Sequence, residues 1–466
     1  ALPATDFSPI GALDTIINDG LTAAIADNAG IFLFLVILGV MVALVNATGG
    51  SAAFGRWAES HIHSRAGALL ATFALGVLIF IDDYFNCLTV GSVMTPVTDS
   101  QRISRVKLAY LIDATAAPIC MIAPISSWAA AVSGVAAKLD TGVSGIQLFI
   151  EAIPYNFYSL LTIVFVITMV VLGVDYGPMA AAELKAAQTG DLGALSEEQE
   201  EGSSRANMWD MLIPIILLII FCVIGLIYVG GFWDPETNAG DFIAAFGDTD
   251  AFVGLPWGAL IALVLSIIYL CARRVITFKG AMGCMTKGFN AMVPAILILT
   301  FAVSLKSMTG LLGAADYVEG LMKQASEGLF MLLPAIIFVV ACLLAFATGT
   351  SWGTFGILIP IVLPIFNAAP DLQIMGISAC LAGAVCGDHC SPISDTTIMA
   401  SAGANCNHID HVSTQIPYAV TVAAICFVNY ILAAFIRNVV ISLAIGVVMV
   451  IGTLLVIRSV QSRKTA

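Results

Sequence analysis

The most informative stretch of this chain is CGDHCSPISDTT, residues 386–397, which lies between two apolar stretches. It contains two carboxylates (Asp388 and Asp395), an imidazole, several hydroxyls, a glycine and a proline. An ionisable group at the centre of a bilayer costs at least ~3 kcal/mol, so such groups usually lie where ions or protons move. Glycine and proline also interrupt a helix and free backbone groups to act as ligands. The stretch therefore predicts a polar site embedded in a membrane.

The composition supports a membrane location. Of 466 residues, 59% are hydrophobic and only 11% are charged, whereas soluble domains carry about 25% charged residues. Many apolar stretches reach the ~20 residues that a helix needs to span the hydrocarbon. We therefore predict an all-α polytopic membrane protein with roughly 11–13 helical elements. The net charge of −13 excludes a nucleic acid as partner, because acidic residues repel phosphate.

Lysine and arginine predict the orientation, since they concentrate on the cytoplasmic side. The loop 232–254 has neither residue and is expected outside. The stretch 273–287 has four of them and the tail 458–464 has three, so both are expected inside. The chain is thus predicted to be a multi-pass protein of the inner (plasma) membrane, with its C-terminus cytoplasmic and its N-terminus outside.

The two halves of the chain resemble each other. Residues 34–49 (FLVILGVMVALVNATG) align with 295–310 (AILILTFAVSLKSMTG), and a polar break follows each. A polar segment with a proline comes next in both halves, at 113–118 and 388–392. The charge distribution gives the halves opposite orientations, and an inverted repeat with broken helices and re-entrant hairpins is typical of secondary transporters.

This repeat suggests a division into five parts. We expect an interfacial N-terminal segment (1–29), a first inverted repeat (30–173), a linker with two transmembrane helices (174–289), a second inverted repeat (290–437), and a C-terminal transmembrane helix with a cytoplasmic tail (438–466).

The first half offers two candidate polar sites. Asp82 or Asp83 lies one helical turn from Asn86, and such an oxygen-rich edge suits sodium or a shared proton; the alternative is a helix end in water. Asp113 is followed by Thr115, Pro118, Ser126 and Ser127, which suits a hairpin whose tip reaches the middle of the membrane. The alternative for Asp113 is an ion pair with a basic residue of the preceding loop, namely Arg102, Arg105 or Lys107.

The second half offers the richer candidate site. Hydroxyls and two glycines at 348–354 favour an unwound segment that exposes carbonyls, although small residues also serve ordinary helix packing. The candidate ligands in this half are Thr348, Gly349, Thr350, Ser351, Trp352, Asp388, His389, Ser391, Ser394, Asp395 and Thr396. For sodium itself the candidates are Asp113, Ser351, Asp388 and Asp395.

Three further groups are ambiguous. His389 could carry protons or simply make a hydrogen bond within the fold. Lys306 could extend to the interface or pair with a carboxylate of the site. His408, Asp410, His411 and Gln415 precede a helix start, so we expect them at a surface or vestibule rather than in the core site.

Four motifs together resemble the NhaC-type sodium/proton antiporter family of the ion transporter superfamily. They are FIDDYFNCLTVGSVMTPVTD (80–99), DATAAPICMIAPISSWAA (113–130), GTSWGTFG (349–356) and GDHCSPISDTT (387–397). The family pattern GDxxSPxSDT falls on Gly387, Asp388, Ser391, Pro392, Ser394, Asp395 and Thr396, and GTSWGT falls on 349–354. The first-half motifs belong to one branch of the family, and relatives carry organic acids or amino acids.

The resemblance implies a secondary transporter with two inverted repeats, which makes a homodimer an expectation as well. The first hypothesis is sodium/proton antiport by alternating access, with aspartates that bind Na⁺ or H⁺ in competition; no cofactor is expected beyond these coupling ions. The alternative is a sodium- or proton-coupled carrier of an amino acid or organic carboxylate. An intramembrane aspartyl protease would also need two aspartates, close enough to share a proton. The repeat and the additional polar breaks favour a carrier and not an enzyme.

Overall fold

The structure is a computed structural model, and it describes residues 2–80, 83–124, 126, 128–129, 132, 145–195, 205–312, 331–366 and 370–465. These residues are helical almost throughout, and the one β-bridge among them joins Ala194 to Cys406. The N-terminal helices are η1 (Leu2–Thr5), α1 (Pro9–Thr15), η2 (Ile16–Thr22) and α2 (Ala23–Asp27). The elements that follow are α3 (Ala29–Thr48), α4 (Gly50–His61), α5 (Arg65–Leu78), α6 (Asp83–Ser100), α7 (Arg105–Thr115), α8 (Ala117–Cys120), α10 (Gly145–Ala152), η3 (Ile153–Tyr155), α11 (Phe157–Leu172) and α12 (Gly177–Thr189). The remaining ones are α13 (Trp209–Val229), α14 (Phe242–Gly247), α15 (Ala251–Ala272), α16 (Phe278–Leu311), α19 (Leu333–Thr348), α20 (Ser351–Ile365), α21 (Pro370–Cys390), α22 (Asp395–Gly403), α23 (His408–Ile436) and α24 (Val439–Thr465).

The all-α membrane fold class is confirmed. Within the described residues, five helices are long and apolar enough to cross a membrane, namely α3, α13, α15, α23 and α24. The number rises to seven if each of two bent pairs is one span. These pairs are α10 with α11, bent by 48°, and α21 with α22, bent by 50°. The apolar stretch 145–173 is therefore not one straight helix, because the chain turns at η3, which contains Pro154.

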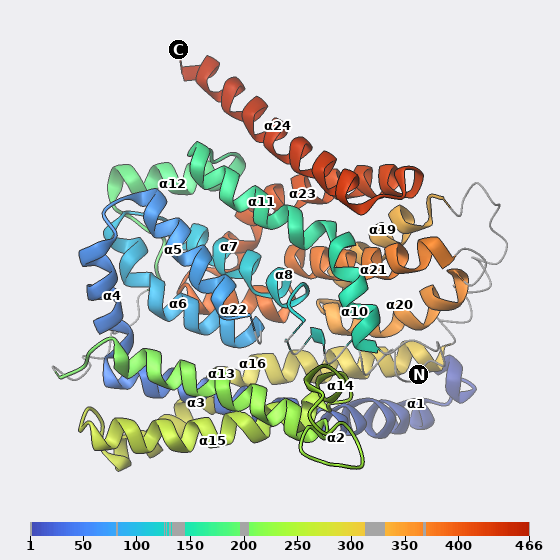
Figure 1. Cartoon of the computed structure of the whole chain (residues 1–466), viewed down its shortest axis with the longest axis horizontal. Coiled ribbons are helices and arrows are strands. Elements are labelled where there is room, and N and C mark those ends of the chain that lie inside the picture. The colour runs from blue at the N-terminus through green and yellow to red at the C-terminus, as the bar shows by residue number, and fades with distance from the viewer. Residues whose placement is uncertain are drawn as a thin grey trace.

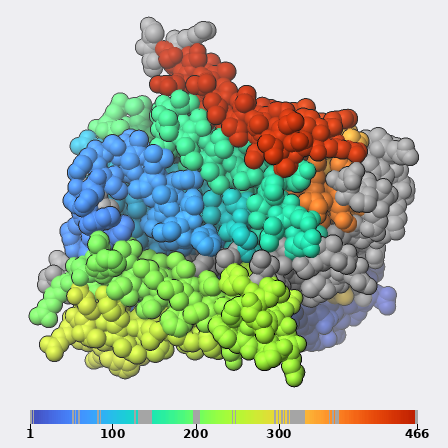
Figure 2. Space-filling model, in the orientation of Figure 1, coloured from blue at the N-terminus to red at the C-terminus, as the bar shows by residue number. Residues whose placement is uncertain are grey.

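The helices form layers that place the broken elements in the middle (Figure 1). Helices α3, α13, α15 and α16 lie together along one side of the molecule and pack on one another. The elements α5–α8 and α19–α22 lie beside this layer, and α11, α12, α23 and α24 cover them from the other side. Figure 2 shows the same layers from outside, with α24 running across α11. α16 is continuous through the predicted domain boundary at 289/290.

Glycines bring the backbones of crossing helices close together. A Cβ atom on Gly387 of α21 would lie 2.1 Å from the carbonyl oxygen of Cys342 in α19. A Cβ on Gly91 of α6 would lie 2.3 Å from the backbone of Gly403 in α22. Such contacts between small residues are typical of helix association in membranes. The Gly91–Gly403 contact joins the two halves of the chain, and the Gly387–Cys342 contact joins two helices of the second half.

The helix breaks occur at the polar segments that the sequence indicated. α5 ends at Leu78 before Asp83, α7 ends at Thr115, α19 ends at Thr348 before Gly349, and α21 ends at Cys390 before the 391–394 turn. Gly349 has φ +65°, and a Cβ there would lie 2.6 Å from the carbonyl oxygen of Ile393, so only glycine fits. The breaks follow the same order in both halves of the chain. An inverted twofold relation between the halves stays a prediction.

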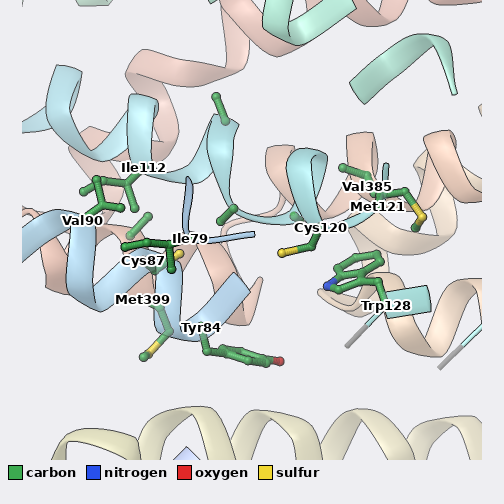
Figure 3. Packing of buried hydrophobic residues seen from close by; sticks show 14 of the residues in the cluster. Ile79, Tyr84, Cys87, Val90, Ile112, Cys120, Met121, Trp128, Val385 and Met399 are labelled. Carbon is green, nitrogen blue, oxygen red and sulfur yellow. The ribbon is translucent and has the colours of Figure 1, made fainter. Parts of the chain in front are cut away.

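Buried apolar side chains from both halves meet around these breaks (Figure 3). The cluster includes Ile79, Tyr84, Cys87, Val90, Ile112, Cys120, Met121, Trp128, Val385 and Met399. Because interiors are close-packed, this core holds the helix ends in fixed relative positions.

Candidate functional site

Asp388 lies in the last turn of α21 and is fully buried. Its Oδ2 accepts hydrogen bonds from Ser351 Oγ at 2.8 Å and from Thr396 Oγ1 at 3.4 Å. Its Oδ1 accepts none from any described residue. Asp388 is therefore a buried carboxylate whose side-chain partners are hydroxyls only and whose second oxygen accepts no hydrogen bond from the described residues.

Asp395 lies close to Asp388 at the start of α22. Its Oδ1 accepts a hydrogen bond from the backbone N–H of Thr396 at 2.8 Å, and its Oδ2 accepts one from the Tyr84 hydroxyl of α6. The Ser394 hydroxyl caps α22 and lies 3.0 Å from Thr396 Oγ1. Since Thr396 contacts both carboxylates, the two acidic groups share one buried environment. In the described part of the chain, neither aspartate has a lysine, arginine or histidine within ion-pair distance.

Two tryptophans pack against each other beside Ser351. Trp352 follows Ser351 in α20, and its ring packs edge-on against Trp128 with 6.0 Å between centroids. Both indole nitrogens are buried and donate to no described residue. Figure 3 shows the Trp128 nitrogen and the Tyr84 hydroxyl on the sides of their rings that face each other.

Asp113 lies in the last turn of α7 and forms a second buried cluster. Its Oδ2 accepts a hydrogen bond from Gln415 Nε2 at 2.9 Å and lies 3.3 Å from His411 Nε2. His389 Nε2 lies 3.9 Å from the same oxygen. The Gln415 side chain also donates to the carbonyl oxygen of His389 at 2.6 Å, and Tyr158 OH lies 2.8 Å from His389 Nδ1. Four helices, α7, α11, α21 and α23, supply these groups.

The structure decides against one alternative and one expectation about this cluster. The alternative that Asp113 pairs with the basic loop is excluded, because Arg105 binds Asp99 at 2.8 Å and Lys107 binds Asp175. His411 and Gln415 are not at a surface or vestibule; both are fully buried. Their spacing of four residues places them on one helix face, and this signal could have identified them as a pair. His408 is only half-buried and binds Ser401 and the Pro392 carbonyl instead.

Several predicted ligands in the first half make hydrogen bonds to the backbone. The Asn86 amide donates to three carbonyl oxygens, those of Gly76 (2.6 Å), Ile79 (2.9 Å) and Thr115 (3.1 Å). It thereby joins the ends of α5 and α7. Thr115 Oγ1 donates to the carbonyl of Leu111, and Ser126 Oγ donates to that of Cys120. Asp83 is buried and accepts from the N–H of Tyr84. Asp82, Ser127 and the side chain of Lys306 lie outside the described residues.

The same holds for most predicted ligands near the α19–α20 break. Thr348 donates to the Leu344 carbonyl, and Ser391 donates to the Phe346 carbonyl. Thr350 Oγ1 accepts from the N–H of Gly353. The Ser391 and Thr350 hydroxyls thereby bind backbone groups that the broken helix leaves without a helical partner. Of the predicted residues in this half, Ser351, Asp388, Asp395 and Thr396 converge on one position.

Comparison with known proteins identifies related transporters. The model of the Na⁺/H⁺ antiporter family matches residues 119–435. An uncharacterized protein of Haemophilus influenzae is 37% identical over 93% of this chain and 85% of that protein. The arginine/ornithine antiporter ArcD of Halobacterium salinarum is 26% identical over 50% of this chain and 44% of its own length.

A further relative is the malate-2H⁺/Na⁺-lactate antiporter of Bacillus subtilis, which is 26% identical over 42% of each chain. Among solved structures, the YdaH transporter of Alcanivorax borkumensis aligns with a TM-score of 0.46 and 15% identity over 93% of this chain and 90% of that one.

Proposed function

This chain belongs to the Na⁺/H⁺ antiporter family, a family of membrane-embedded secondary transporters and not of enzymes, and we propose that it exchanges sodium ions for protons. The observation that carries the proposal is the environment of Asp388. Its carboxylate is buried, is held by two hydroxyls and has one oxygen without a partner among the described residues.

The chemistry of this environment suits an alkali cation. Hard cations are bound by oxygen atoms, and Ser351 and Thr396 can each turn a lone pair toward a bound ion. Asp388 also lies at the C-terminal end of α21, where the helix dipole favours positive charge. Sodium would therefore be held by the Asp388 carboxylate and these two hydroxyls.

Exchange follows from the cost of leaving the site empty. An isolated buried charge costs several kcal/mol, and here two carboxylates share one buried environment. A bound sodium ion or a proton removes part of that negative charge, and each makes the binding of the other less favourable. An alternating-access movement that carries the loaded site across the membrane then links the two fluxes.

The proposal is tested with purified protein in proteoliposomes that contain a pH indicator. Adding NaCl outside should alkalinise the lumen if protons leave as sodium enters, and choline chloride should not. Asp388→Asn should abolish the signal, whereas Asp410→Asn, on the exposed first turn of α23, should retain it. The absence of any sodium-dependent proton movement by the wild-type protein would refute the proposal.

The two tryptophans support a second candidate, which is a coupled carrier of an amino acid or organic carboxylate. The indole N–H groups of Trp128 and Trp352 are buried donors without a described acceptor, so they could bind a solute carboxylate. Asp388 could bind an ammonium group, and two relatives are named as antiporters of organic solutes. This function predicts movement of the coupling ion, sodium or proton, only when an amino acid or carboxylate is added. Sodium-driven proton movement without organic solute favours the first candidate.

A further inference from the structure

We propose that the ion pair between Lys107 and Asp175 is a latch, which closes one side of the carrier and opens in each transport cycle. The latch consists of these two side chains and of the Tyr418 hydroxyl, which binds the same carboxylate. Its role rests on the proposed alternating access but not on which solute is carried.

The ammonium group of Lys107 is buried with few partners. The side chain is 1% exposed, and its Nζ binds Asp175 Oδ1, which also accepts a hydrogen bond from the Tyr418 hydroxyl at 2.7 Å. The same Nζ lies 3.1 Å from Met169 Sδ and 5.2 Å from the centre of the Tyr418 ring, whose face attracts a cation. The Asp175 carboxylate therefore neutralises a buried charge and joins α7 to α23.

Asp175 lies in a segment that has a glycine hinge at each end. This segment, 173–177, joins α11 to α12, and both Gly173 and Gly177 have φ +62°. A Cβ on Gly173 would have nothing within 4 Å, so this glycine is required by its backbone conformation and not by lack of space. Residues at the ends of elements absorb the dihedral changes of hinge movements. The segment can therefore swing and separate Asp175 from Lys107.

A row of packed rings leads from the latch to the cation site. Tyr418 packs edge-on against Tyr110 with 5.0 Å between centroids, and Tyr110 stacks on His389 at 6.1 Å. All three rings are almost fully buried, and His389 follows Asp388 in the chain. Opening the latch removes the hydrogen bond that fixes the Tyr418 ring, so a movement of the hinged segment reaches the surroundings of Asp388.

The C-terminal helix indicates which side of the membrane the latch closes. Gln461 Nε2 of α24 donates to the backbone carbonyl oxygen of Asp175 at 2.6 Å. Gln461 belongs to the tail 458–464, whose arginines and lysine predict a cytoplasmic position. The closed latch therefore shuts the predicted cytoplasmic side, and its opening is the step that gives the cation site access to that side.

An ion pair is suited to a contact that must both close and open. Separating two charges in a dry interior costs several kcal/mol, because each is left without a partner. The Asp175 side chain is already 24% exposed, so movement of its segment admits water, and hydration of both charges offsets the lost attraction. An apolar contact has no such compensation, since its exposure to water is unfavourable. The pair thus favours two states, one closed and one hydrated.

The decisive experiment replaces the ion pair by a covalent link that can be reversed. In Lys107→Cys/Asp175→Cys, a short bis-methanethiosulfonate reagent joins the two thiols, and dithiothreitol releases them. Cross-linking should slow sodium-driven proton movement in proteoliposomes by about tenfold or more, because one of the two access states is lost, and the reductant should restore it. Sodium binding measured by calorimetry should stay within about threefold, since the cation site is intact in the closed state.

Two controls accompany this experiment. Lys185→Cys/Asp191→Cys replaces an exposed lysine–aspartate pair at the end of α12, and its transport should be the same before and after cross-linking. The wild-type protein receives the same reagent, because its own eleven cysteines are buried or half-buried. Unchanged transport after cross-linking at 107 and 175 would overturn the latch, since a contact that only supports the fold can be made permanent without loss of function.

A single variant decides the case in which the double variant does not fold. Asp175→Asn keeps an oxygen acceptor for the Tyr418 hydroxyl but removes the charge that holds Lys107. Amide hydrogen exchange at 386–390, next to the cation site, should become about threefold faster or more, because the open state is more populated. Asp191→Asn should leave this exchange unchanged, and local loosening around Asp175 would not reach these residues.

Exchange at 386–390 in Asp175→Asn that equals the wild-type rate would also overturn the latch. The antiport proposal fails on a different result, which is the absence of sodium-driven proton movement by the untreated wild-type protein. Hydrogen exchange still tests the latch in that case, because it does not depend on the solute.

Discussion

Replacing Ser351 by alanine tests the cation site most directly. The Ser351 hydroxyl donates to Asp388 Oδ2 at 2.8 Å, and both side chains are buried. A hydrogen bond to a charged group contributes about 1.5–3 kcal/mol. If the hydroxyl oxygen becomes a sodium ligand in the bound state, its loss removes a contribution of the same order. Since 1.4 kcal/mol is a factor of ten, sodium should bind about 10- to 150-fold more weakly.

The assay measures sodium binding to purified protein by calorimetry and sodium-driven proton movement in proteoliposomes. Thr354→Val is the matched control, because this buried hydroxyl lies one turn further along α20 and donates to the Thr350 carbonyl of its own helix at 2.9 Å. Its sodium affinity should stay within about fivefold of the wild-type value, since only a backbone bond of about 1 kcal/mol is lost. A sodium affinity of Ser351→Ala within threefold of wild type, or an equal loss for Thr354→Val, would refute the role of Ser351.

Three further predictions concern the contacts that hold the site in place, each measured as the change in thermal unfolding of the purified protein. Gly387→Ala should destabilise the fold by about 1–3 kcal/mol, because the new Cβ would lie 2.1 Å from a carbonyl oxygen of α19. The control is Gly452→Ala, where nothing lies within 4 Å of the new Cβ, and this change should be neutral or stabilise α24 by up to about 1 kcal/mol. Equal effects of the two changes would contradict the close contact between α19 and α21. Asn86→Asp should lower the stability of the fold more than Asn86→Ala, since a carboxylate would face three carbonyl oxygens. If Asn86→Ala were the less stable variant, the Asn86 amide would not be what joins α5 to α7. Glu183→Ala should lower the free energy of unfolding by about 1–3 kcal/mol, because the buried N–H of Ser104 at the start of α7 loses its acceptor. Arg65→Ala should lower it by about 1 kcal/mol or less, because the ion pair of Arg65 with Glu183 is partly exposed. A larger loss for Arg65→Ala than for Glu183→Ala would show that the ion pair, and not the hydrogen bond to Ser104, is the stabilising contact of Glu183.

The fold class and the positions of the helix breaks could be predicted from the sequence because both depend on local properties. Apolar stretches of sufficient length indicate transmembrane helices wherever they occur. Gly349 and the 391–394 turn interrupt helices at the predicted places, since glycine and proline change the backbone within one or two residues. The importance of Asp388 could also be recognised locally, because a carboxylate between apolar stretches is costly in any fold.

The partners of the polar side chains were not predictable in this way. Nothing near Asn86 in the sequence indicated that its amide N–H group would bind carbonyl groups of two other segments. Asp113 seemed able to pair with a nearby arginine or lysine, yet its partners come from α21 and α23. These partners are about 275 to 300 residues away along the chain. At that separation the spacing of residues along the chain does not indicate which side chains meet, unless a repeat or a motif relates the two segments.

The sequence by itself determined that this chain is a helical membrane protein with polar helix breaks, because the cost of burying charge in lipid depends on residue type and on the immediate surroundings. Only the tertiary structure decided which of its aspartates share a site. Close packing through Gly387, Gly91 and Gly403 brings α6, α19, α21 and α22 together. Asp388 meets hydroxyls from α20 and α22, whereas Asp113 meets imidazoles from α21 and α23, and of these partners only Thr396 is near its aspartate in the local sequence.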